Sequence, residues 1–141
     1  MNVKHMIIIV LTLVVVSSTM QVMATKNIET TTLDISDIKG GIGGVTAVIT
    51  NTGDITVENF AISLFVEGGI LGNIDISKIC SGCGDCGTTI PVGESKAEST
   101  TESGFIFGFG PVDILVTASA DNADLISEVT TGFVIGPLVI I

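Results

Sequence analysis

The stretch that most constrains the fold is residues 45–69, in which two runs of alternating apolar and polar residues flank a short break. Every second position is apolar, at Val45, Ala47 and Ile49 in the first run and at Phe60, Ile62, Leu64 and Val66 in the second. Successive side chains of a strand point to opposite faces, so this spacing predicts two strands, each with one buried face. Between them, we expect Asn51 and Gly53 to permit a tight reversal through positive φ angles.

Similar short runs, punctuated by glycine, proline and Asx residues, continue along the chain. We expect strands over residues 30–38, 45–50, 60–67, 70–79, 95–102, 112–120 and 125–141. The segment 95–102 is almost wholly polar, with Lys96, Glu98 and Glu102, which suits the edge of a sheet. This spacing is typical of an all-β chain, and we predict an immunoglobulin-like antiparallel β-sandwich of about seven strands.

Residues 104–111 are the densest aromatic segment. Phe105, Phe107 and Phe109 alternate with glycine and isoleucine. We expect these three rings to plug one end of the core rather than to form a binding platform.

The first 24 residues have the order of a signal peptide. Lys4 and His5 precede an apolar run that begins at Met6, and Ser17 to Thr19 and a small-residue cleavage site that ends at Ala24 follow. The run is shorter than the roughly 20 apolar residues of a membrane span. We therefore expect a signal-peptide helix over residues 1–24 and one sandwich domain over residues 25–141. The protein would be secreted, extracellular or at the cell surface, and an uncleaved N-terminal anchor, which would be its only membrane contact, is the alternative.

The charge of the chain excludes some classes of partner. Fifteen acidic residues against five lysines give a formal net charge of −10. Nucleic-acid binding needs a basic footprint, so we expect no nucleic-acid partner, and an anionic membrane surface is disfavoured for the same reason. The acidity is consistent with solubility, or with cation binding.

Three cysteines form one cluster, Cys80, Cys83 and Cys86, spaced C-x₂-C-x₂-C in a glycine-rich loop predicted over residues 80–87. Converging thiolates at this spacing can hold zinc or an iron–sulfur cluster. A fourth ligand would have to be Asp85, a hard oxygen donor among soft thiolates, because the only histidine lies in the signal segment. A site made of these four residues, holding zinc or iron, is therefore one hypothesis, and no cofactor is the other.

A disulfide is the competing interpretation of the cysteine cluster. Cysteines of a secreted protein meet oxidising conditions and pair. A bond between Cys80 and Cys86 would staple the loop, although all three pairings stay open. The odd thiol would then be free or would join two chains.

Nothing in the sequence marks a catalytic site, so we predict that the protein is not an enzyme. No nucleophile elbow or phosphate-binding loop occurs, and the commonest general base is missing because residues 25–141 contain no histidine. Asp121, Asn122 and Asp124 could offer oxygens to Ca²⁺, but Asx residues at a strand-to-strand turn explain them without an ion.

Three turn motifs together resemble the CARDB-like, cell-adhesion-related, immunoglobulin-like domains of archaeal and bacterial surface proteins. They are Ile49-Thr-Asn-Thr-Gly-Asp54, Pro91-Val-Gly-Glu-Ser95 and the turn at Asp121-Asn122. The resemblance implies that the second and third strands lie in opposite sheets, so that residues 51–54 form an arch rather than a hairpin. It also implies a role in extracellular architecture or adhesion, with no catalytic residues to carry over.

These observations favour a secreted or cell-surface structural or interaction module without catalytic activity. Its partners would be other surface proteins or itself. One alternative is a subunit of an extracellular assembly, joined by an intermolecular disulfide or by strand addition through residues 25–33 or 133–141. The other is a small metal-binding or redox protein that uses the Cys80, Cys83 and Cys86 loop.

Overall fold

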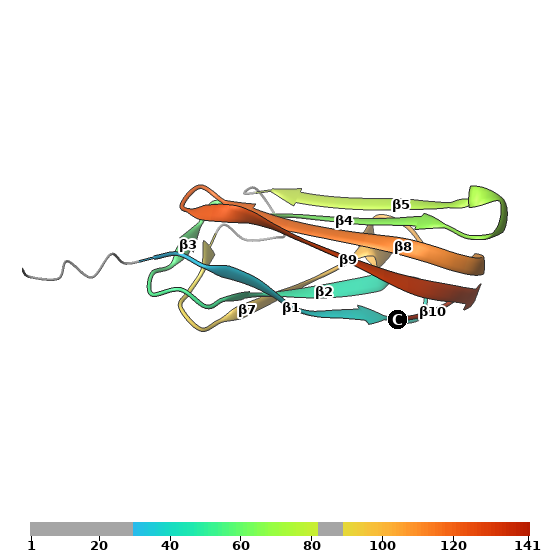
Figure 1. Ribbon diagram of the computed structural model, residues 1–141, viewed down its shortest axis with the longest axis horizontal. Coiled ribbons are helices and arrows are strands. Elements are labelled where there is room, and N and C mark those ends of the chain that lie inside the picture. Colours follow the sequence, from blue (N-terminus) through green and yellow to red (C-terminus); the bar gives the residue numbers. More distant parts are fainter. Residues whose placement is uncertain (1–29, 82–88) are drawn as a thin grey trace, which may run out of the picture.

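A computed structural model describes residues 30–81 and 89–141 of the chain. Two antiparallel sheets pack face to face, which confirms the predicted all-β sandwich (Figure 1). The helix predicted for residues 1–24 lies outside the described residues. Within the described ranges, no helix has the length and apolar character needed to cross a membrane.

The two sheets have the strand orders β1-β2-β7 and β10-β9-β8-β4-β5. The smaller sheet contains β1 (Leu33–Gly40), β2 (Val45–Asn51) and β7 (Ser95–Ser99); the larger contains β4 (Ala61–Gly68), β5 (Ile74–Ser81), β8 (Gly108–Ala120), β9 (Ala123–Gly136) and β10 (Leu138–Ile140). A separate pair joins β3 (Val57–Glu58) to β6 (Thr89–Ile90), and the 3₁₀ turns are η1 (Ile70–Gly72) and η2 (Thr100–Glu102). Apart from the three short strands β3, β6 and β10, the described residues contain seven strands, in an immunoglobulin-like order.

The core lies between the two inner faces, as the alternation in residues 45–69 predicts. Val45, Ala47 and Ile49 of β2 are fully buried. They face the fully buried or nearly fully buried Phe60, Ile62, Leu64 and Val66, which come from β4 and the residue before it. Because β2 and β4 belong to different sheets, residues 51–54 form an arch, as the resemblance implies, and not a hairpin.

The arch works differently from the expected reversal, because neither Asn51 nor Gly53 takes a positive φ angle. The Asn51 side chain is fully buried, and its Nδ2 donates hydrogen bonds to the carbonyl oxygens of Ile55 at 2.8 Å and Ile90 at 2.9 Å. Its Oδ1 accepts from the amide of Gly53 at 3.0 Å. At Gly53, an added Cβ would lie 2.4 Å from the carbonyl oxygen of Thr30, so only glycine allows the chain to pass there.

Strand β10 closes one side of the sandwich. It pairs with β9, and its Val139 amide donates to the carbonyl oxygen of Gly41 at 3.0 Å, in the turn after β1. The start of the described chain is also paired, since the amides of Thr52 and Asp54 donate to the carbonyls of Thr32 and Thr30. In this structure, therefore, residues 30–33 and 133–140, which include the described parts of the two expected strand donors, are bound within their own chain.

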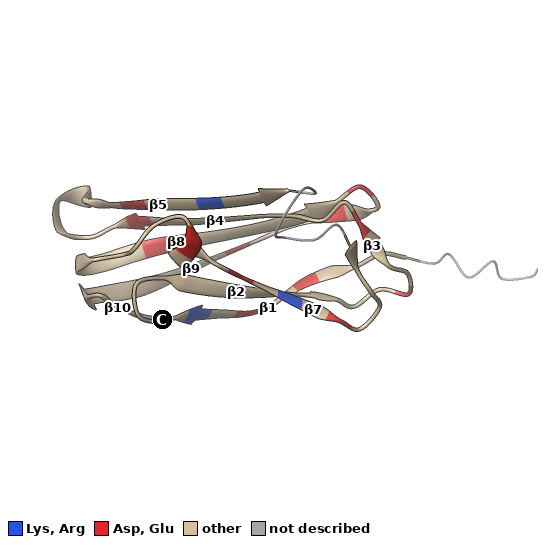
Figure 2. Ribbon diagram, turned by 180° about the vertical axis from the view of Figure 1, so that it is seen from behind, with Lys and Arg blue, Asp and Glu red and all other residues tan. Residues whose placement is uncertain are grey.

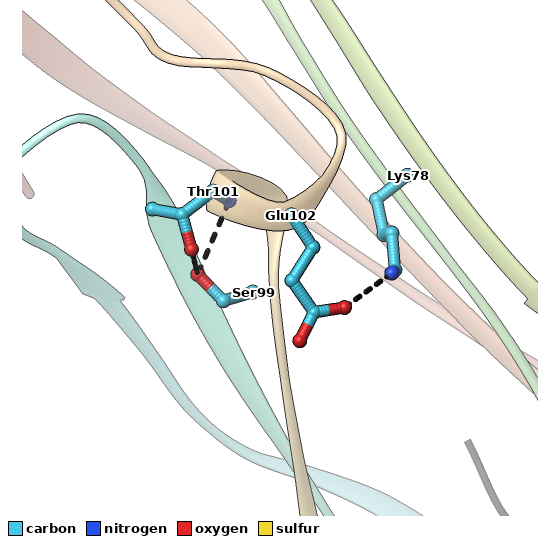
Figure 3. Close-up of polar contacts among 4 residues, drawn as sticks. All are labelled: Lys78, Ser99, Thr101 and Glu102. Atoms are coloured by element: carbon cyan, nitrogen blue, oxygen red, sulfur yellow. Dashed lines mark hydrogen bonds and ion pairs between the residues drawn. The ribbon is translucent and has the colours of Figure 1, made fainter. Parts of the chain in front are cut away.

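A polar contact bridges the other side, between β5 and η2 (Figure 3). Lys78 Nζ lies 2.6 Å from Glu102 Oε2. Ser99 begins η2, because its Oγ accepts from the Thr101 amide. This contact links the edge strand of the large sheet to the chain that leaves the small one.

The edge position predicted for residues 95–102 is correct, although β7 ends at Ser99 and η2 follows. Register places Glu98 opposite Ala47 and Lys96 opposite Ile49, so both charged residues point toward the inner face, and Glu98 is buried. Charges that point inward on an edge strand oppose pairing with a foreign strand.

The strand predicted over residues 70–79 starts later, at Ile74. Residues 70–72 instead form the η1 turn, in which Leu71 takes a φ of 72°. Ile70 is exposed in this turn, whereas Ile74, the first residue of β5, is buried.

Candidate interaction surface

Cys80 is the one member of the cysteine cluster among the described residues. It lies in β5, opposite Ile62, and is 3% exposed, so the predicted loop does not begin at Cys80 as expected. Cys80 is disulfide-bonded in this structure. Cys83, Asp85 and Cys86 lie outside the described residues, and the pairing of Cys80 with Cys86 stays a prediction.

The metal hypothesis also stays a prediction, because three of its four ligands lie outside the described residues. Within residues 30–81 and 89–141, no group of three or more His, Cys, Asp or Glu side chains is placed to hold a metal ion.

The turn at Asp121 and Asn122 uses its oxygens within the protein. Asn122 Oδ1 accepts from the Glu58 amide at 2.9 Å, and its Nδ2 donates to the Thr56 carbonyl oxygen at 2.9 Å. Asp121 Oδ2 accepts from Asn59 Nδ2 at 2.5 Å. These bonds fix β3 against the β8–β9 turn and give Asp121 and Asn122 a structural role.

The expectation that three phenylalanines plug the core is wrong. Phe105, Phe107 and Phe109 are 60%, 69% and 53% exposed, and Ile106 between them is the buried residue, at 1%. The inner-face positions of this segment continue the two-residue period of Val112 through Gly110 and Gly108 to Ile106. Phe109, within β8, therefore takes the opposite, outer face, whereas Phe105 precedes the strand and lies beside Gly43.

Phe109 belongs to a contiguous apolar surface on the outside of the large sheet. Register places Leu138, Ile135 and Phe109 in one row across β10, β9 and β8, and Ile140, Phe133 and Pro111 in the next. All six residues are exposed. We call these six residues the apolar block. The rings of Phe109 and Phe133 meet edge to face, with centroids 5.3 Å apart.

Acidic side chains lie across the same face, next to the apolar block. Glu67 of β4 is directly opposite Asp113 of β8 on one side and Asp75 of β5 on the other. We call these three residues the acidic row. Beyond it, Phe65, Leu115 and Val129 form a further apolar row.

A hollow of about 320 Å³ opens on this outer face between the acidic row and the row of Phe65, Leu115 and Val129. Its lining residues are Phe65, Glu67, Asp113, Ile114, Leu115 and Val129. Its lining therefore combines apolar residues with two acidic ones.

One pattern in the sequence indicates this apolar surface, although the prediction of strands made no use of that pattern. Residues 133–135 and 138–141 are apolar at every position, not at every second one. A continuous apolar strand indicates that both of its faces can be covered. Of these residues, Val134 and Val139 are buried on the inner face, whereas those on the outer face are exposed.

Comparison with known proteins adds no identification, since no protein-family model matches the chain and a search of curated proteins finds no match.

Proposed function

We propose that this protein is a secreted or cell-surface structural and interaction module without catalytic activity. The single observation that carries the proposal is the apolar block, which is exposed on an otherwise regular sandwich. Contiguous apolar patches larger than a few hundred Å² are rare on monomers and mark contact sites. The signal-like order of residues 1–24 and the resemblance to CARDB-like domains support the extracellular placement.

The test compares a double variant, Phe109→Ser with Phe133→Ser, with the control Leu125→Ser. Leu125 is also exposed on β9, but it lies outside the apolar block. The full chain is expressed in its host, and the cell envelope and the medium are assayed for the protein. We expect the wild type and the control in the envelope fraction and the double variant in the medium. An identical distribution of all three proteins, each with an unchanged melting temperature, would contradict the proposal.

The extracellular placement has its own measurement. Intact mass of the protein recovered from the medium or envelope should show a chain that begins at Thr25. A chain that retains residues 1–24 in the envelope would support the anchor instead, and a full-length chain in the cytoplasm would contradict both.

A second candidate function is assembly, and the position of β5 as the last strand of the large sheet, among the described residues, favours it. β5 is an edge strand of eight residues that contains Cys80 near its end. An extended segment of a neighbour could pair there, by main-chain hydrogen bonds. Non-reducing electrophoresis and sedimentation over a range of concentrations test this. A protein that remains a monomer throughout would count against assembly.

A further inference from the structure

The acidic row has an unfavourable arrangement in the isolated protein. Like charges directly opposite one another on one face of a sheet repel. Glu67 has such a neighbour on each side, Asp113 and Asp75. The acidic row therefore costs stability unless a cation approaches it.

Within the described residues, no lysine of the chain is placed on this face. Lys78 lies opposite the buried Leu64, on the inner side of β5, and contacts Glu102. Lys39 and Lys96 belong to the other sheet, where Lys39 pairs with Asp37. The cation must therefore come from outside the described part of the chain.

The hollow fits a long cationic side chain. Phe65 and Leu115, which are neighbours in its lining, suit the aliphatic stem of lysine or arginine, because such stems pack on apolar surface while the charged head group stays in polar surroundings. Glu67 and Asp113 would then receive the head group, and an arginine fork can bind a carboxylate through two hydrogen bonds.

We infer that the apolar block and the acidic row together bind a cationic, amphipathic protein segment. Its apolar side chains would cover the block, and a lysine or arginine would enter the hollow. This inference rests on the proposed interaction function and names the class of partner. Pro111 and Asp113 are two residues apart on β8, so the apolar and cationic groups of the partner must lie roughly 7 Å apart.

A second copy of the chain is a poor occupant by the same argument. Its own outer face would bring another acidic row and no described lysine. An anionic membrane would repel the row as well.

The experiment measures binding of synthetic peptides to the full mature chain by fluorescence anisotropy. The probe peptide alternates phenylalanine and valine with serine and ends in two arginines. Matched peptides replace the arginines by glutamine or glutamate, or the apolar residues by serine. We expect the arginine peptide to bind about tenfold tighter than the glutamine peptide, and the glutamate and serine peptides to bind weakest.

Protein variants locate the site. Glu67→Gln with Asp113→Asn should reduce binding of the arginine peptide to the level of the glutamine peptide. The control, Asp124→Asn with Glu128→Gln, removes the same charge elsewhere and should leave binding within about twofold. Phe109→Ser with Phe133→Ser should abolish binding.

Several results would overturn the inference. Equal loss of binding in the acidic-row variant and in its charge control would show that the peptide is attracted only by the net charge of −10 of the whole chain and not by the acidic row. Equal binding of arginine and glutamine peptides, or a self-association that needs Phe133, would reject the cationic partner but leave the interaction function standing. No binding by any probe, together with an unchanged envelope distribution of the block variant, would reject both.

Discussion

Asn51 is the residue on which the arch between the two sheets most depends. Asn51→Ala removes three hydrogen bonds and leaves the Gly53 amide and the carbonyls of Ile55 and Ile90 without their side-chain partner. We expect a loss of about 2–4 kcal/mol in the free energy of unfolding, measured by urea denaturation. The same change at the exposed Asn73 should cost less than about 0.5 kcal/mol. Equal costs at the two positions would show that the arch does not need the side chain.

Gly40 permits the contact between β1 and β10. An added Cβ would lie 2.2 Å from the carbonyl oxygen of Val139, so Gly40→Ala must push β10 away from its place. We expect a loss of about 1–3 kcal/mol and faster hydrogen exchange at the Val139 amide. Gly41→Ala is the control, since the nearest atom to its added Cβ is 4.0 Å away. Unchanged exchange at Val139 in Gly40→Ala would mean that the closure tolerates the methyl group.

At the scale of elements, substitutions in the residues just before β8 test which side chains belong to the core. Ile106→Ala should cost about 2–5 kcal/mol because it empties a buried site, whereas Phe107→Ala should cost less than about 0.5 kcal/mol. Thermal unfolding of the two variants checks this order. A larger loss for Phe107 than for Ile106 would restore the phenylalanine plug predicted from the sequence.

The strands were predictable where one face is apolar and the other is polar. In β2 and β4 the two-residue period leaves one choice of inner face, and the structure follows it. In residues 104–111 the phenylalanines occupy one set of alternate positions, and Ile106 with three glycines occupies the other. Only the larger size of the rings favoured their set as the core face. A one-residue change of frame exchanges the two faces. The correct choice of inner face could have been extended back from Val112, which shares the inner face of β8 with Ile114 and Val116.

The candidate surface was not predictable because it depends on neighbours far apart in the sequence. The acidic row forms because β8 pairs with β4 and β4 with β5. Nothing in the local sequence of Glu67 indicates that Asp113 will lie beside it. Sequence patterns locate the strands, but strand order decides which outward residues meet.

At the scale of the whole molecule, charge is unevenly distributed along the sandwich. Figure 2 shows acidic residues near the β3 end. There Asp121 contacts Asn59, and the Asp54 amide donates a hydrogen bond to the carbonyl oxygen of Thr30. The opposite end, around the η1 turn, carries exposed apolar residues such as Leu71 and Phe107. Figure 2 also shows acidic residues on β4, β5 and β8 toward this end. A partner that covers the apolar block therefore meets negative charge at the acidic row, which lies next to the block on the same face.

Repulsion within the acidic row should make the free energy of unfolding depend on salt concentration, and the Glu67→Gln variant tests this. Glu67→Gln removes the central carboxylate and with it both cross-strand repulsions, so we expect a gain of about 0.2–1 kcal/mol in the free energy of unfolding at low salt. At 1 M salt the Debye length falls to about 3 Å, and the gain should vanish. Glu128→Gln is the matched control, because its partner in register is Val116 and not a carboxylate. Urea denaturation of both variants at about 0.01 M and 1 M salt checks this. A gain in Glu67→Gln that persists at 1 M salt, or an equal gain in the control, would mean that repulsion within the acidic row does not destabilise the protein. A cationic partner would then gain no free energy by neutralising that repulsion.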